Sequence, residues 1–62
     1  MRHYTPKEEA CYEAAYRVLV SEPISEITKL RYSKRCITVL AIECGREVSF
    51  EVFQNGRIER LM

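Results

Sequence analysis

The chain has 62 residues, a formal net charge of +1 and 47% hydrophobic residues, which suffices for one small domain and no more. Leu, Ile, Val and Phe occupy 16 positions, above the level at which a nearly neutral chain stays disordered. No apolar run approaches the roughly 18 to 20 residues of a membrane span, and because the first residues are polar we expect no secretory signal. We therefore expect a single domain over residues 1–62, located in the cytoplasm.

The chain contains three cysteines, Cys11, Cys36 and Cys44. An odd number of cysteines without a signal peptide is typical of free thiols in a reducing compartment, and we interpret all three as small buried side chains. A zinc site needs four ligands at suitable spacing, but the chain has no C-x-x-C or H-x-x-x-H pair, and His3 is its only histidine. We expect no metal and no other cofactor, which leaves self-association as a means of reinforcing so small a core.

The residues after position 4 predict a helix over 6–21. Thr5 can cap the first free amides, Pro6 suits the first helical position, and Glu8 stands where a capping box places a carboxylate. Pro23 disfavours helical angles at the residue before it, so the helix should end at about Ser21.

The predicted helix has two apolar stripes. The first should face the core, with Glu13 and Arg17 on the opposite side at the favourable i, i+4 spacing. The second stripe points outward toward the charged side. The core-facing residues are Cys11, Ala14, Ala15, Val18 and Leu19, and the outward stripe is Tyr12, Tyr16 and Val20.

After Pro23 the hydrophobic period changes from about 3.6 to 2, which predicts strands. Turn residues at 33–35, at Gly45 and at Asn55-Gly56 separate them. The segment 36–44 is apolar on both parities, as in a strand that is covered on both faces. The predicted fold class is α+β, with the helix packed on an antiparallel meander of three to four strands at about 27–32, 36–44, 46–53 and 57–61.

Two registers are open for the last hairpin. A two-residue turn pairs Phe53 with Ile58 and places Glu51 opposite Arg60. A three-residue loop with a left-handed glycine pairs Val52 with Ile58 but sets two glutamates opposite each other. We favour the two-residue turn, because opposite charges across a strand pair are stabilising.

One helix can cover only one face of such a sheet, whereas the strand at 36–44 offers apolar side chains to both. We expect Phe53, Ile58 and Tyr32 to add to the uncovered face. A monomer rarely leaves a large apolar patch exposed, so we predict that this face, or the outward stripe, is buried against another protein chain, most simply a second copy related by a two-fold axis. The alternative is that the strand is merely central and the domain exposes some apolar atoms.

Nothing in the sequence indicates catalysis, a small-molecule substrate or a phosphate-binding loop. Basic residues are concentrated in residues 27–62, which carry seven basic and four acidic side chains. Their densest group could protect an edge strand, bind an acidic protein surface, or bind nucleic acid with one aromatic side chain for stacking. This possible surface for anionic ligands comprises Lys29, Arg31, Tyr32, Lys34 and Arg35.

The sequence therefore predicts a non-enzymatic protein–protein interaction or regulatory module that forms a homodimer or binds another protein. The alternative is a nucleic-acid-binding regulator that uses the basic hairpin at 29–35. The residues predicted to contact the protein partner are Tyr12, Tyr16, Val20, Phe53 and Ile58.

Overall fold

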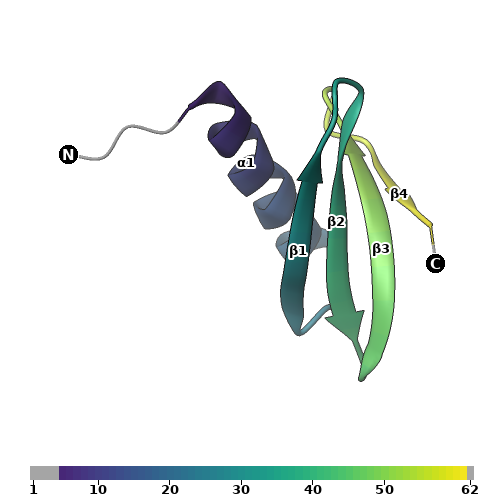
Figure 1. The fold of residues 1–62 in the computed structure, drawn as a ribbon. Helices are drawn as coiled ribbons and strands as arrows, with labels where there is room; N and C mark the ends of the chain where they lie inside the picture. The colour runs from purple at the N-terminus through teal and green to yellow at the C-terminus, as the bar shows by residue number, and fades with distance from the viewer. Residues whose placement is uncertain (1–4, 62) are drawn as a thin grey trace.

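The computed structural model describes residues 5–61 and shows one helix packed on one antiparallel sheet (Figure 1). The elements are α1 (Pro6–Ser21), β1 (Glu26–Tyr32), β2 (Cys36–Glu43), β3 (Arg46–Phe53) and β4 (Ile58–Arg60). The sheet order is β1-β2-β3-β4, so each strand pairs with its neighbour in the chain. The predicted α+β class and meander are confirmed. His3, discounted above as a metal ligand, lies outside the described residues.

The helix begins and ends where the local sequence predicts. The Glu8 amide donates to Thr5 Oγ1 at 3.1 Å, and the Thr5 amide donates to Glu8 Oε1 at 3.1 Å, which completes the capping box. At the other end Glu22 is extended, and its amide donates to the Val18 carbonyl at 2.9 Å. Local capping and Pro23 therefore set both ends of α1.

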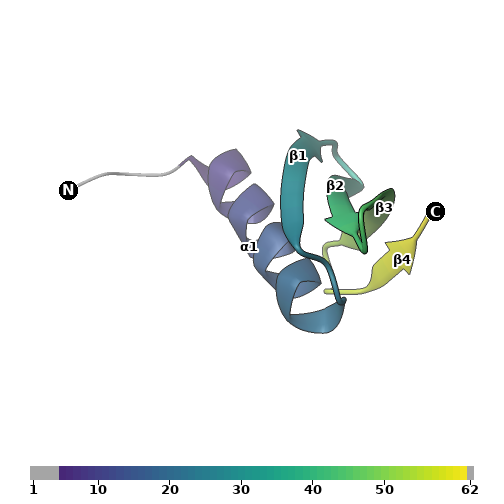
Figure 2. The ribbon, with the colours of Figure 1, turned by 90° about the horizontal axis from the view of Figure 1, so that it is seen from below.

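The helix buries a narrower face than predicted. It packs mainly over β1 and β2 and less over β3, and Figure 2 shows it on the β1 side of the sheet with β4 at the far edge. Ala14 and Val18 are buried, but Leu19, predicted on the core face, is 49% exposed. That prediction was wrong, because Leu19 lies about 100° around the helix from Val18 and beyond the reach of the sheet.

The core lies between α1 and the sheet face toward it. Alternate residues of β2 and β3 point into it, as the pleat requires, and Val39 and Phe50 are fully buried. Thr38, Leu40 and Ile42 of β2 have the other parity and are only half-buried, and nothing in residues 5–61 covers their face, called the open face below. The buried residues are Ala14, Val18, Ile37, Val39, Ala41, Val48, Phe50 and Val52.

Two aromatic or apolar side chains expected on the open face lie on the helix side instead. Tyr32 is opposite Ile37, and Ile58 is opposite Val52, and both of those partners are core residues. Directly opposed residues share a face, so the prediction was wrong for Tyr32 and Ile58. Only Phe53 lies on the open face as expected.

The β2–β3 turn begins one residue earlier than predicted. Cys44 and Gly45 both have positive φ, 52° and 79°, as in a two-residue hairpin turn of type I′. Cys44 is therefore an exposed turn residue and not a buried strand residue, which corrects both predictions for it. Cys11 and Cys36 are half-buried, and all three thiols are free.

The last hairpin adopts the three-residue register. Val52 is opposite Ile58, so the favoured two-residue turn was wrong and the alternative is confirmed. Gly56 has φ of 90°, which a non-glycine residue adopts at a cost, and the Arg57 amide donates to Asn55 Oδ1 at 2.9 Å. These two local features stabilise the longer loop.

The three-residue register sets Glu51 opposite Glu59. Like charges in directly opposite positions destabilise a strand pair. The Arg57 guanidinium offsets this repulsion, because Arg57 Nη2 lies 2.7 Å from Glu59 Oε2. The strand itself is shorter than the predicted 57–61, with ladder pairs only at Ile58–Arg60.

Arg60 on β4 contacts Glu43 at the C-terminal end of β2 and Glu22 just after α1. Its guanidinium donates to both carboxylate oxygens of Glu43, lies 3.7 Å from Glu22 Oε1 and is 5.6 Å from the centre of the Phe50 ring. The hydrogen bonds from Arg60 hold the pKa of Glu43 below its ordinary value. This cluster closes the core at the end opposite the hairpin turns 33–35 and 54–56.

Two valines on α1 test the orientation of the helix. Val18 is fully buried and Val20 is 64% exposed. Val18→Ala should lower the free energy of unfolding by about 2 kcal/mol through lost burial and the cavity left behind. Val20→Ala, the matched control, should change it by less than about 0.5 kcal/mol. Urea unfolding followed by circular dichroism measures both, and equal losses would contradict the orientation.

Cys44 occupies a backbone conformation that asparagine adopts more readily than cysteine. Cys44→Asn should therefore raise the free energy of unfolding by about 0.5 kcal/mol, whereas Cys44→Val should lower it by about 1 kcal/mol because a branched side chain resists positive φ. Thermal unfolding under reducing conditions measures both shifts. The same sign of change for the two variants would contradict the turn geometry.

The Glu43–Arg60 contact predicts a specific pH dependence. The folded-state pKa of Glu43 is lowered. The contribution of the Glu43–Arg60 contact to the free energy of unfolding is therefore complete above the ordinary glutamate pKa, about 4.3. It is lost as the pH falls through the folded-state pKa. Glu43→Gln should thus be less stable than the parent at pH 7, and this difference in the free energy of unfolding should be smaller at pH 3. Urea unfolding at both pH values tests this, with Glu47→Gln on the open face as the control for one lost charge. A gap of unchanged size would refute the prediction.

Candidate functional site

The outer surface of α1 carries the most exposed apolar side chains on the described chain. Tyr12, Tyr16 and Val20, predicted as the outward stripe, are 52%, 67% and 64% exposed. Leu19 joins them, because it lies about 100° around the helix from the buried Val18 and faces away from the sheet. Residues three or four apart are neighbours on a helix surface, so Tyr12, Tyr16, Leu19 and Val20 form one continuous surface, called the helix stripe below.

A groove of about 340 Å³ lies beside the helix stripe, between the second half of α1 and the β3–β4 loop. Tyr16 and Val20 form one wall, and Gly56 and Ile58 form the other. A side chain at Gly56 would place its Cβ 3.0 Å from Arg17 Nη1, so the glycine also makes room for the Arg17 guanidinium against the loop. We call this the stripe groove.

The structure therefore brings together four of the five predicted partner-contacting residues. Tyr12, Tyr16 and Val20 share the helix stripe, and Ile58 faces it across the stripe groove. Phe53 is not part of this surface. It lies at the end of β3 on the open face, with the Arg57 guanidinium 5.9 Å from the centre of its ring.

The predicted anionic-ligand residues are divided between three places. Lys29 and Arg31 lie on β1 and point to the open face, opposite Leu40 and Thr38 of β2. Tyr32 points to the helix side, where Lys7 Nζ is 5.4 Å from the centre of its ring. The aromatic ring is thus separated from the two strand cations that it was expected to accompany.

Lys34 and Arg35 occupy the tip of the β1–β2 turn. In an antiparallel meander the first and third turns lie at the same end of the sheet, and Figure 1 shows both at the top of the molecule. A shallow groove of about 600 Å³ separates them. We call it the tip groove, and its lining residues are Lys34, Arg35, Phe53, Gln54 and Asn55.

The sequence analysis assigned Phe53 to a protein partner, treated Asn55 only as a turn residue and gave Gln54 no role. Phe53, Gln54 and Asn55 stand 18 to 21 positions after Lys34 and Arg35 along the chain, and no local pattern connects the two segments. The meander topology was the signal that could have placed them together, because it sets the turn at 33–35 beside the turn at 54–56.

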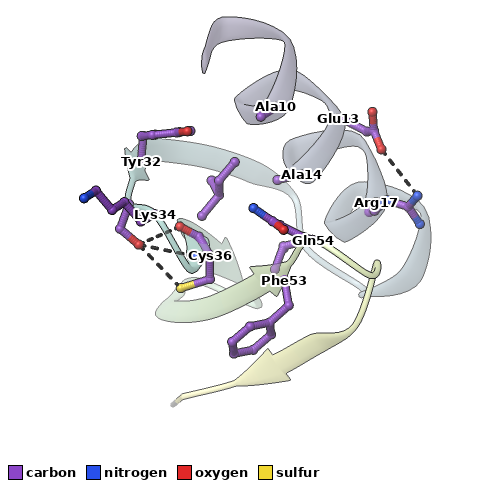
Figure 3. A pocket seen from close by; sticks show the side chains of 12 residues that line it. Ala10, Glu13, Ala14, Arg17, Tyr32, Lys34, Cys36, Phe53 and Gln54 are labelled. Carbon is purple, nitrogen blue, oxygen red and sulfur yellow. Dashed lines mark hydrogen bonds and ion pairs between the residues drawn. The ribbon is translucent and has the colours of Figure 1, made fainter. Parts of the chain in front are cut away.

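A third cleft, of about 200 Å³, lies where α1 meets the ends of the strands (Figure 3). Ala10, Ala14 and Val52 contribute apolar side chains, and Lys34 also lines it. Ser33 Oγ donates to the Cys36 carbonyl at 2.7 Å and lies 3.8 Å from Cys36 Sγ. Glu13, Arg17 and Gln54 also line the cleft, so charged, polar and apolar side chains all contribute to it. In residues 5–61 no buried side-chain polar atom lacks a hydrogen-bond partner.

The described residues contain no group of three or more His, Cys, Asp or Glu that could hold a metal ion. Among residues 5–61 there is also no helix long and apolar enough to cross a membrane. No protein-family model matches the chain, and searches of curated proteins and of solved structures give no significant match.

Proposed function

We propose that the chain is a non-enzymatic protein–protein interaction module that self-associates through the helix stripe. The observation that supports this is the exposure of Tyr12, Tyr16, Leu19 and Val20, each about half or more, on one side of one helix. Contiguous apolar surface of this kind is typical of an interaction site, and tyrosine is enriched at such sites.

The open face of the sheet is a poorer candidate for the main contact. Leu40 and Ile42 are already half-buried by their neighbours. Lys29 on β1 and Ser49 on β3 flank Leu40, so polar side chains surround the apolar centre. Less apolar area remains to be removed from water there than on α1.

A second copy fits the helix stripe when the two helices run antiparallel. A two-fold axis at the level of Tyr16 then sets Tyr12 of one copy beside Leu19 and Val20 of the partner, because residues 12 and 20 lie equally far along the helix from residue 16. Tyr12 and Val20 lie on either side of that axis, so the same contact forms twice. Such self-complementarity is what a two-fold interface requires.

The charges favour the antiparallel arrangement as well. Glu13 and Arg17 lie on the groove side of α1, 3.4 Å apart between Oε1 and Nη2. Reversing the partner's direction sets Glu13 near the partner's Arg17, and the reverse pair forms by symmetry. A parallel pair would instead bring together the acidic first turns, which contain Glu8 and Glu9, and like charges repel.

The interface is small, so the association should be weak. A helix of 16 residues is about 24 Å long, and helix contact plus the groove would bury roughly 800 to 1,000 Å² in total, the lower limit for a specific interface. We therefore expect a dimer with a dissociation constant in the micromolar range.

Sedimentation equilibrium across protein concentration tests this proposal. The parent chain should shift from monomer to dimer mass over tens of micromolar, under reducing conditions because Cys44 is exposed. Tyr16→Ala should weaken the dimer at least tenfold through lost contact area. Tyr32→Ala removes another half-exposed tyrosine, on the sheet, and should leave the mass curve unchanged. A parent chain that stays monomeric at every concentration would overturn the homodimer.

Charge exchange tests the arrangement of the two helices. Glu13→Arg alone and Arg17→Glu alone should each weaken the dimer, because each places like charges across the interface. The double exchange should restore it, because both reciprocal pairs reform with reversed sign. If the double variant associates no better than the two single variants, the antiparallel arrangement is wrong.

A further inference from the structure

The tip groove combines features that the proposed self-association does not use. Lys34 and Arg35 come from one turn, and Phe53, Gln54 and Asn55 come from the other. No carboxylate is among these lining residues. The groove is therefore cationic, contains one aromatic ring, and lies at the end of the sheet away from the Glu22 and Glu43 carboxylates that bind Arg60.

A third cation adjoins the ring. The Arg57 guanidinium is 5.9 Å from the centre of the Phe53 ring, within range of a cation–π contact, and its Nη2 is held by Glu59 at 2.7 Å. The same residue's amide donates to Asn55 Oδ1, so the free end of that side chain is the amide NH2, a hydrogen-bond donor. Contacts among residues 53–59 thus hold the Phe53 ring, the Arg57 guanidinium and the Asn55 amide close together.

We propose that the tip groove binds single-stranded nucleic acid. Lys34 and Arg35 would contact backbone phosphates, and Phe53, with Arg57 behind it, would stack an unpaired base. Cations that follow a backbone beside an aromatic platform are the combination that such binding uses. A duplex keeps its bases stacked on each other and offers no face to the ring, and an acidic peptide would use the cations without needing the ring.

The number of cations sets the expected strength and salt dependence. Each phosphate contact on a single strand lowers the logarithm of the binding constant by about 0.7 per tenfold rise in salt. The two contacts made by Lys34 and Arg35 then predict a slope of about −1.4, so the affinity should fall roughly sevenfold between about 50 and 200 mM NaCl. This is a modest binder compared with dedicated nucleic-acid domains.

Fluorescence anisotropy of a short labelled oligothymidylate tests the proposal. The parent chain should bind at low salt with the slope given above. The double variant Lys34→Gln/Arg35→Gln should lose at least tenfold in affinity. The matched control Lys29→Gln/Arg31→Gln removes the same charge from the open face of β1 and should stay within about twofold, since those side chains do not line the groove.

The role of the ring needs its own variant. Phe53→Leu keeps an apolar side chain at this half-buried position, and it should lower affinity about tenfold through lost stacking with the salt slope unchanged. Circular dichroism and thermal unfolding confirm that the variant is folded. Tyr16→Ala should bind like the parent chain, which keeps this test independent of the self-association.

Three results would overturn the proposal. The first is no salt-dependent binding by the parent chain. The second is equal loss in the two lysine–arginine double variants, which would indicate a diffuse electrostatic field. The third is full competition by a polyglutamate peptide of similar length together with no effect of Phe53→Leu, which would identify the groove as an acidic-peptide site.

Discussion

A single helix of 16 residues covers one face of this sheet, and it does so from the β1 side. The small residues Ala10 and Ala14 let α1 lie close to the strands, but they also limit how much sheet the helix can shield. Val18 and Phe50 are fully buried where the helix contacts the sheet. Leu19 and Val20, which follow Val18 on the helix, are 49% and 64% exposed. The helix stripe and the stripe groove remain exposed because α1 covers only part of the sheet.

The helix does not reach the β4 edge of the sheet, and polar contacts stabilise that edge instead. Arg60 on β4 binds Glu43 of β2 and approaches Glu22 at the end of α1, and its guanidinium lies against Phe50. This fixes β4 while leaving a gap between α1 and the β3–β4 loop. The stripe groove lies in that gap, with Gly56 providing space for Arg17.

The two surfaces proposed to bind partners differ in physical character. The helix stripe is apolar and aromatic, with its charges paired at Glu13 and Arg17. The tip groove is cationic, with one ring and two amide side chains. Because the first lies on α1 and the second at the hairpin turns, occupation of one leaves the other accessible, and a dimer through the helix stripe would present two tip grooves.

The sequence by itself determined the features that depend on residues a few positions apart. Thr5, Glu8 and Pro23 set the ends of α1, and the alternation of Val48, Phe50 and Val52 set the buried face of β3. The outward stripe was also predictable, because helical spacing alone defines it. Only the tertiary structure decided the register of the last hairpin, since one extra loop residue moves Ile58 to the other face. It likewise decided how far the helix reaches over the sheet, and it joined Lys34 and Arg35 to Phe53, because contacts between distant segments depend on how whole elements pack.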